Sequence, residues 1–151
     1  MMTDFTCIFP TRIIFGKTAV DQLGEQAAKF GKRALLVYGK GSIIKTGLYD
    51  RVVKILKDNE MEIFELSGVL PNPRLSTCLE GVEICKSNNI EVIIAVGGGS
   101  VLDTAKSISA GALDDGDLWD FHTRKRLIEK TLPVVSVMTV AATGSEYDGI
   151  S

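Results

Sequence analysis

The chain has 151 residues, of which 45% are hydrophobic and 24% charged, a composition that fits one globular domain and excludes a largely disordered chain. Its formal net charge of −2 argues against a nucleic-acid binder, which would carry a basic excess. No apolar run approaches the roughly 20 residues that cross a bilayer, and the N-terminus lacks a secretory signal. We therefore expect no membrane partner and a cytoplasmic location, which three widely spaced cysteines without a disulfide framework also favour.

The N-terminal region predicts a β-hairpin followed by a helix. Residues 5–9 and 12–15 are strand-like segments joined by Pro10 and Thr11. From residue 18 to residue 30, apolar side chains recur at the spacing of one helix face. We therefore expect the chain to begin with a hairpin and a helix before the main alternation of strands and helices.

Strand-like apolar runs alternate with helix-like stretches over the rest of the chain. The predicted strands cover residues 34–38, 62–66, 91–96 and 133–138. The predicted helices, whose apolar side chains share one helix face, cover residues 48–56, 75–85 and 102–112. Such alternation predicts a parallel sheet with helices on both faces, that is, a doubly wound, Rossmann-like α/β fold.

Three polar loops follow predicted strands, at the edge of the sheet where ligands of such folds bind. They comprise residues 39–42, 97–100 and 139–146. Their glycines leave the backbone accessible, because a Cβ would block the approach of a ligand. A helix that begins after residues 97–100 adds free N–H groups and the positive end of its dipole. This arrangement predicts a phosphate site, and the three loops together favour a nucleotide.

Simpler explanations stay open for several of these features. The glycine run could be a tight turn with Ser100 as the N-cap of the next helix. Asp103 and Lys106, three residues apart, could form a local ion pair instead of contacting a ligand. The dinucleotide pattern GxGxxG and the P-loop are both absent. The single histidine, His122, cannot by itself build a multi-histidine metal site.

The glycine loops belong to longer motifs that are spread over nearly the whole chain. The stretch GGGSxxDxxK, with Asn-Pro upstream and Thr-Gly-Ser-Glu downstream, is highly specific in combination. With these motifs the sequence resembles the N-terminal domain of the iron-containing alcohol dehydrogenases, and within them the butanol dehydrogenase branch. The matching segments are residues 13–16, 35–42, 71–73, 97–106 and 139–146.

The resemblance implies an NAD(P)-dependent enzyme that transfers hydride between the nicotinamide and a small primary alcohol or aldehyde, such as butanol or butanal. In that family the loop of residues 97–100 holds the diphosphate of the dinucleotide. Gly39 stands where NAD-preferring relatives carry an aspartate that repels a 2′-phosphate, and Lys40 and Ser42 could bind that phosphate. We therefore expect NADP(H) to be preferred over NAD(H). The implied cofactor-binding residues are Gly39, Lys40, Gly41, Ser42, Asn72, Gly97, Gly98, Gly99, Ser100, Asp103, Thr139, Val140, Thr143 and Ser145.

The resemblance also implies that the divalent metal of the family, iron or zinc, lies in a second, helical domain. Its ligands, an aspartate and three histidines, would lie beyond residue 151, so no catalytic or metal-binding residue is expected within residues 1–151. We expect residues 1–151 to form one dinucleotide-binding domain that binds cofactor but does not turn over alcohol by itself. Because relatives are commonly dimers, a homodimer is also expected.

Three alternative hypotheses compete with the dehydrogenase. A non-catalytic module for nucleotides or sugar phosphates would use the same glycine loops without redox chemistry. A relative of the dehydroquinate synthases would share the fold, although the run from Thr143 to Glu146 argues mildly against it. A structural or interaction protein would bind nothing at these turns, and a dinucleotide would then cause no thermal shift.

Overall fold

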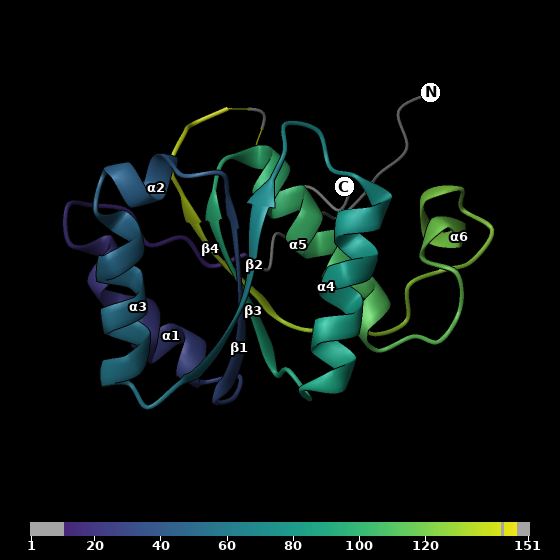
Figure 1. Ribbon diagram of the computed structural model, residues 1–151, viewed down its shortest axis with the longest axis horizontal. Coiled ribbons are helices and arrows are strands. Elements are labelled where there is room, and N and C mark those ends of the chain that lie inside the picture. Colours follow the sequence, from purple (N-terminus) through teal and green to yellow (C-terminus); the bar gives the residue numbers. More distant parts are fainter. Residues whose placement is uncertain (1–10, 143, 148–151) are drawn as a thin grey trace, which may run out of the picture.

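The computed structural model describes residues 11–142 and 144–147 of the chain. Its centre is a sheet with the strand order β2-β1-β3-β4 (Figure 1). The strands are β1 (Arg33–Gly39), β2 (Glu62–Val69), β3 (Val92–Gly97) and β4 (Val134–Met138). All three pairings between these strands are parallel, which confirms the predicted α/β fold with helical crossovers.

Helices cover both faces of this sheet (Figure 1). Helices α1, α2 and α3 pack on one face, α4 and α5 pack on the other, and α6 lies beside α5. Their bounds, with those of a short 3₁₀ helix η1, are η1 (Ala19–Gln22), α1 (Leu23–Ala28), α2 (Ser42–Lys45), α3 (Leu48–Asp58), α4 (Leu75–Ser87), α5 (Gly99–Ala112) and α6 (Leu118–His122). None of the helices within the described ranges has the length and apolar character of a membrane span.

The two faces of the sheet bury separate hydrophobic clusters, because side chains alternate along each strand. On β1, Leu35 belongs to the cluster beneath α4 and α5, whereas Leu36 belongs to the cluster beneath α1 and α3. Every residue of β3 is buried, with Ile93 and Ile94 in the two opposite clusters. This two-sided burial explains why β1 and β3 are continuous apolar runs.

Several predicted boundaries shift in the structure. Of the predicted hairpin, residues 5–9 lie outside the described residues, and residues 12–15 are described without a strand. The helix predicted over residues 18–30 is η1 followed by a short α1, and Gly31, with a φ of 152°, follows its end. Helix α6 was not predicted; its N-cap is Asp117, whose carboxylate accepts a hydrogen bond of 2.9 Å from the Trp119 amide.

Candidate functional site

The loops predicted to bind a ligand meet at the C-terminal ends of the strands, because all strands run in the same direction. We call this side of the sheet its carboxyl edge, and the side where the strands begin its amino edge. The Thr139 amide, which directly follows β4, donates to the carbonyl of Gly97 at the end of β3 over 2.9 Å. The Asn72 amide, in the loop after β2, donates to Ser100 Oγ over 3.2 Å. Asn72 has a φ of 62°, a left-handed conformation that asparagine adopts more readily than most residues. Two loops are thus tied directly to the residues around the start of α5.

The glycine run between β3 and α5 forms an open backbone cradle. Gly97 is the last residue of β3, and a Cβ on it would come within 2.7 Å of Val101 Cγ2, so close packing of the helix requires glycine there. A Cβ on Gly98 would meet no atom within 4 Å, so the space beside Gly98 is open. The cradle therefore has room for an anion beside the N-terminus of a 14-residue helix.

Helix α5 begins inside the glycine run, three residues earlier than predicted. The N-cap is Gly98, in an extended conformation and without a side chain that could cap the helix. The alternative with Ser100 as N-cap is therefore wrong: Ser100 lies in the first turn, and its Oγ accepts the Asn72 amide. The first amides of α5 have no acceptor within their own helix, which suits them to an external oxygen.

The loop after β1 brings a second glycine turn and a cation to the same edge. Gly39 ends β1, and Gly41 has a φ of 146°, which favours glycine at that position. Lys40 and Ser42 are exposed. No hydrogen bond or ion pair involves the Lys40 ammonium group within the described part of the chain, so it is available to a ligand.

The loop after β4 folds back over the first turns of α5. Thr139 and Val140 are exposed, whereas Ser145 is only 6% exposed. A Cβ on Gly99 would lie 3.3 Å from Ser145 Oγ, so the serine side chain lies directly against the start of α5. Thr143, the remaining predicted residue of this loop, lies outside the described residues.

Lys106 makes a contact that the sequence did not reveal. Its Nζ donates to the Ser145 carbonyl over 3.2 Å, from the third turn of α5 to the loop after β4. The predicted partner, Asp103, is half-buried near the start of α5. Because the two residues joined by this hydrogen bond are 39 positions apart, no local spacing pattern could have identified it.

Two tyrosines join the end of β1 to the neighbouring strand. The Tyr38 and Tyr49 hydroxyls donate to the two oxygens of the Glu65 carboxylate, over 2.7 Å and 2.8 Å. Burial, with the hydrogen bond to Glu65, raises the pKa of Tyr38. For Tyr49 the hydrogen bond to Glu65 is the larger cause of its raised pKa. Both phenols are therefore neutral near pH 7, and they support β1 just before Gly39.

The remaining polar features of the described residues form neither a metal-ligand cluster nor a site with an ionised thiol. No group of three or more His, Cys, Asp or Glu that could hold a metal ion occurs in residues 11–142 and 144–147. Burial raises the pKa of Cys85 to about 12 and also raises that of Cys78, so both thiols are protonated core residues. A cavity of about 780 Å³ between α5 and α6 and one of about 510 Å³ at the end of α4 are lined by none of the loop glycines.

Comparison with known proteins identifies a matching family and several relatives. The sequence model of the family described as "Iron-containing alcohol dehydrogenase" matches residues 10–151. The NADH-dependent butanol dehydrogenase A of Clostridium acetobutylicum is 48% identical over 150 residues, which cover 99% of this chain and 39% of that protein. The NADPH-dependent aldehyde reductase of Escherichia coli is 39% identical, over 96% of this chain and 38% of that protein. The chain thus spans less than two fifths of the length of these two relatives.

A solved structure gives the same result for the fold. The NADH-dependent butanol dehydrogenase A of Thermotoga maritima matches with a TM-score of 0.91 at 46% sequence identity. The match covers 95% of this chain and 36% of that one. The similarity therefore includes the sheet and the loops at its carboxyl edge, but only about a third of the neighbouring structure.

Proposed function

Because this chain belongs to the iron-containing alcohol dehydrogenase family, we propose that it binds the diphosphate of NAD(P) in the cradle of residues 97–100. The open space beside Gly98, at the start of α5, carries this proposal. Phosphate oxygens there accept hydrogen bonds from backbone amides and lie at the positive end of the helix dipole. A side chain at Gly98 would occupy that space, so the absence of a Cβ is what the ligand requires.

The order of the strands supports an arrangement in which the two halves of the dinucleotide lie on opposite sides of the cradle. Strands β1 and β4 flank β3 on its two sides. We assign the adenosine half to the loop after β1, with Gly39, Lys40, Gly41 and Ser42. The diphosphate lies over the cradle beside Asn72, whose backbone is tied to Ser100. We assign the nicotinamide half to Asp103 and to the loop after β4, with Thr139, Val140, Thr143 and Ser145.

In the full dehydrogenase, the proposed reaction is hydride transfer between NADP(H) and a small primary alcohol or aldehyde such as butanol or butanal. The nicotinamide supplies the hydride chemistry when it is bound, and the residues above bind and orient it. The described residues hold no metal-ligand cluster, so they do not fit the metal of the family, and we assign that metal to a separate helical domain. We expect no detectable turnover of butanol or butanal by the purified chain of residues 1–151.

The preference for NADP(H) rests on the loop after β1. Gly39 adds no carboxylate there, and the exposed Lys40 and Ser42 can bind a 2′-phosphate. The names of the relatives point in both directions: the Clostridium protein is called NADH-dependent and the Escherichia coli protein NADPH-dependent. The ratio of the dissociation constants for NADPH and NADH tests this preference. NADH binding clearly tighter than NADPH would overturn the NADP(H) preference while leaving the dinucleotide site intact.

Titration of the purified chain with NADPH, followed by the fluorescence of the nicotinamide, tests the proposal. We expect saturable binding that NADP⁺ competes away and that ribose 5-phosphate does not. Competition by simple sugar phosphates alone would favour the sugar-phosphate module or the dehydroquinate-synthase-like relative. No binding of any dinucleotide would favour a structural protein. The homodimer and the cytoplasmic location stay predictions, the first of which size-exclusion chromatography with light scattering decides.

A further inference from the structure

The turn formed by residues 144–147 is held on α5 from two directions. Lys106 Nζ donates to the carbonyl of Ser145 over 3.2 Å. The Thr11 hydroxyl donates to the carbonyl of the next residue, Glu146, over 3.1 Å. The turn is closed internally by the Tyr147 amide, which donates to the Gly144 carbonyl over 2.8 Å. Two consecutive carbonyls thus accept hydrogen bonds from side chains that are distant in the sequence.

This turn lies against the cradle as well as against Lys106. Lys106 follows Gly99 by seven residues, which is two helical turns, so both residues lie on the same face of α5. Ser145 extends along that face: its carbonyl accepts from Lys106, and its Oγ lies 3.3 Å from the position of a Cβ on Gly99. The hydrogen bond from Lys106 thus joins the turn to the same face of α5 on which Gly99 lies.

We propose that Lys106 is a positioning residue that holds the 144–147 turn beside the cradle and so shapes the nicotinamide half of the dinucleotide site. This inference rests on the proposed function. The turn follows β4, on the side of β3 opposite to β1 and its loop. A dinucleotide that places its diphosphate at the start of α5 and its adenosine over the β1 loop extends its other half toward this turn. Lys106 touches neither half in this arrangement and acts through Ser145.

The chemistry of the side chain suits this role. Lysine has a long methylene stem that can lie along a helix while its ammonium group reaches a carbonyl beyond it. A hydrogen bond from a charged donor is stronger than one from a neutral group, so Lys106 should hold the turn more firmly than Thr11. Loss of one such bond corresponds to roughly a tenfold change in an equilibrium constant.

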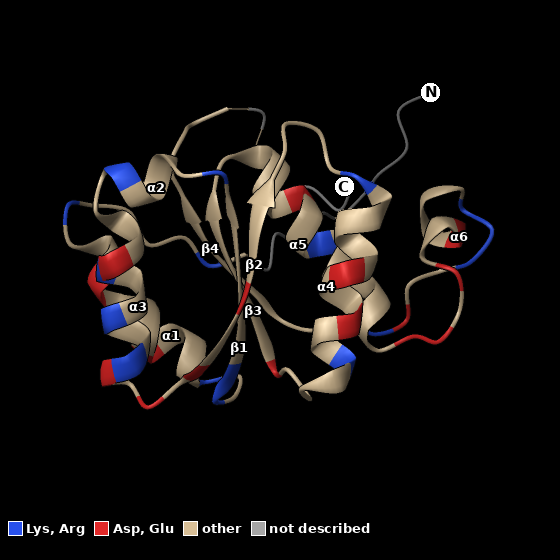
Figure 2. Ribbon diagram, viewed as in Figure 1, with Lys and Arg blue, Asp and Glu red and all other residues tan. Residues whose placement is uncertain are grey.

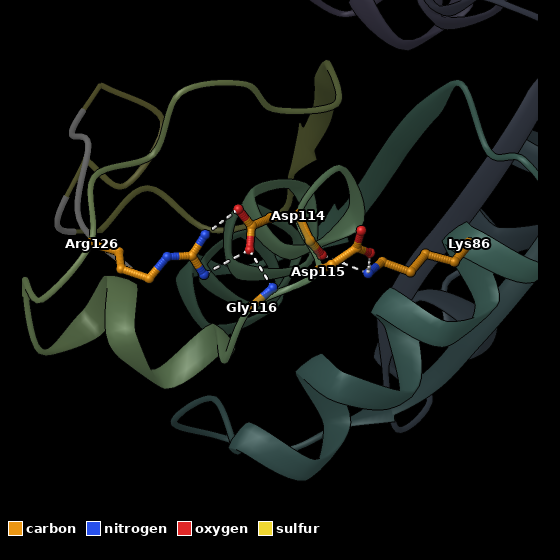
Figure 3. Close-up of polar contacts among 5 residues, drawn as sticks. All are labelled: Lys86, Asp114, Asp115, Gly116 and Arg126. Carbon is orange, nitrogen blue, oxygen red and sulfur yellow. Dashed lines mark hydrogen bonds and ion pairs between the residues drawn. The ribbon is translucent and has the colours of Figure 1, made fainter.

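The test compares Lys106→Met, Lys106→Arg and the control Lys86→Met. Lys86 is a matched control, because its Nζ also donates to a backbone carbonyl, that of Asp114, at the opposite edge of the sheet (Figure 3). Each variant is titrated with NADPH and with 2′,5′-ADP, which lacks the nicotinamide half. We expect Lys106→Met to weaken NADPH about tenfold and 2′,5′-ADP less than twofold. Lys106→Arg should restore most of the loss, and Lys86→Met should leave both ligands unchanged.

Amide hydrogen exchange without ligand gives a second measurement. Lys106→Met should accelerate exchange of the Tyr147 amide, and Thr11→Val should accelerate it by a smaller factor, whereas Lys86→Met should not. Unchanged Tyr147 exchange in Lys106→Met overturns the positioning role. Equal losses for NADPH and 2′,5′-ADP overturn it too, since they would indicate general damage. If the unmodified chain binds no dinucleotide, the proposed function fails, and the exchange measurement alone then decides whether Lys106 holds the turn.

Discussion

The two edges of the sheet use their polar groups in opposite ways. At the amino edge, Glu91 Oε2 accepts the backbone amides of Lys32 and Arg33 over 2.8 Å and 3.0 Å. Figure 2 shows basic and acidic positions together around the lower end of α4 and the start of β1. At the carboxyl edge, the space beside Gly98 at the start of α5 is open, and Lys40 is exposed.

A second network at the amino side ties α6 and its flanking loops to the rest of the molecule (Figure 3). Arg126 donates to both oxygens of Asp114 over 2.8 Å and 2.6 Å, and the Gly116 amide donates to the same carboxylate over 2.7 Å. Lys86 pairs with Asp115 over 2.9 Å. The charged groups of this network are satisfied by one another, whereas the Lys40 ammonium group at the carboxyl edge has no partner within the described ranges. Accessible hydrogen-bond donors therefore indicate a ligand-binding site better than a high density of charged residues does.

The largest expected effect is a loss of NADPH affinity in Gly98→Ala, which contrasts with a loss of folding stability in Gly97→Ala. Gly98→Ala places a methyl group in open space, so we expect an unchanged melting temperature and at least a tenfold loss of NADPH affinity, about 1.4 kcal/mol. Gly97→Ala instead brings a Cβ within 2.7 Å of Val101 Cγ2, and such overpacking costs about 1–3 kcal/mol of folding stability. Thermal melts and NADPH titrations of both variants measure the difference. If a folded Gly98→Ala protein bound NADPH with full affinity, the diphosphate would not bind in the cradle.

A smaller effect is expected at the loop after β1. A Cβ on Gly39 would lie 3.6 Å from the Val69 carbonyl, an ordinary contact, so Gly39→Asp should fold normally. Its carboxylate would repel a 2′-phosphate, and we expect NADPH affinity to fall about tenfold while NADH affinity stays within about twofold. Competition titrations with both cofactors measure this. Equal losses of affinity for NADPH and NADH would indicate that the adenosine half does not bind at the loop after β1.

The smallest expected effect is on stability at low pH, to which two carboxylates at the amino edge contribute. The Arg33 and Lys32 amides lower the pKa of Glu91, and Arg126 lowers the pKa of Asp114. Carboxyls with a lowered folded pKa stabilise the protein above their unfolded pKa values of roughly 4, and this contribution is lost as the pH falls through the folded values. Glu91→Gln and Asp114→Asn should therefore flatten the decline of the urea midpoint below about pH 4. At pH 7 both variants should bind NADPH like the unmodified chain, and a loss of binding would contradict the separation of the two edges.

Those features of the fold that follow from burial and from parallel strand pairing could be predicted from the sequence. Strands β1 and β3 are buried on both faces, so their apolar runs were visible without the structure. Parallel strands bring their carboxyl ends to one edge, so the convergence of the glycine loops was also predictable. The early start of α5 was missed because Gly98 caps the helix through its backbone and leaves no side-chain signature.

Contacts between distant segments could not be predicted from local patterns. Asn72 was expected to contact the cofactor, which stays a prediction; the structure shows that its backbone amide donates to Ser100. Lys106 was considered as a partner for Asp103, at helical spacing, whereas its hydrogen bond goes to Ser145 on another element. Such contacts depend on how the loop after β4 folds back, which the packing of the whole domain decides.

The most direct test of the cradle is an NMR titration of the ¹⁵N-labelled chain with NADPH. The backbone amides at the start of α5 should donate to the diphosphate, so the largest chemical-shift changes should fall on Gly98, Gly99 and Ser100. Amides at the amino edge, such as that of Gly116, should not move. Saturable NADPH binding with unchanged signals for residues 97–100 would contradict the account.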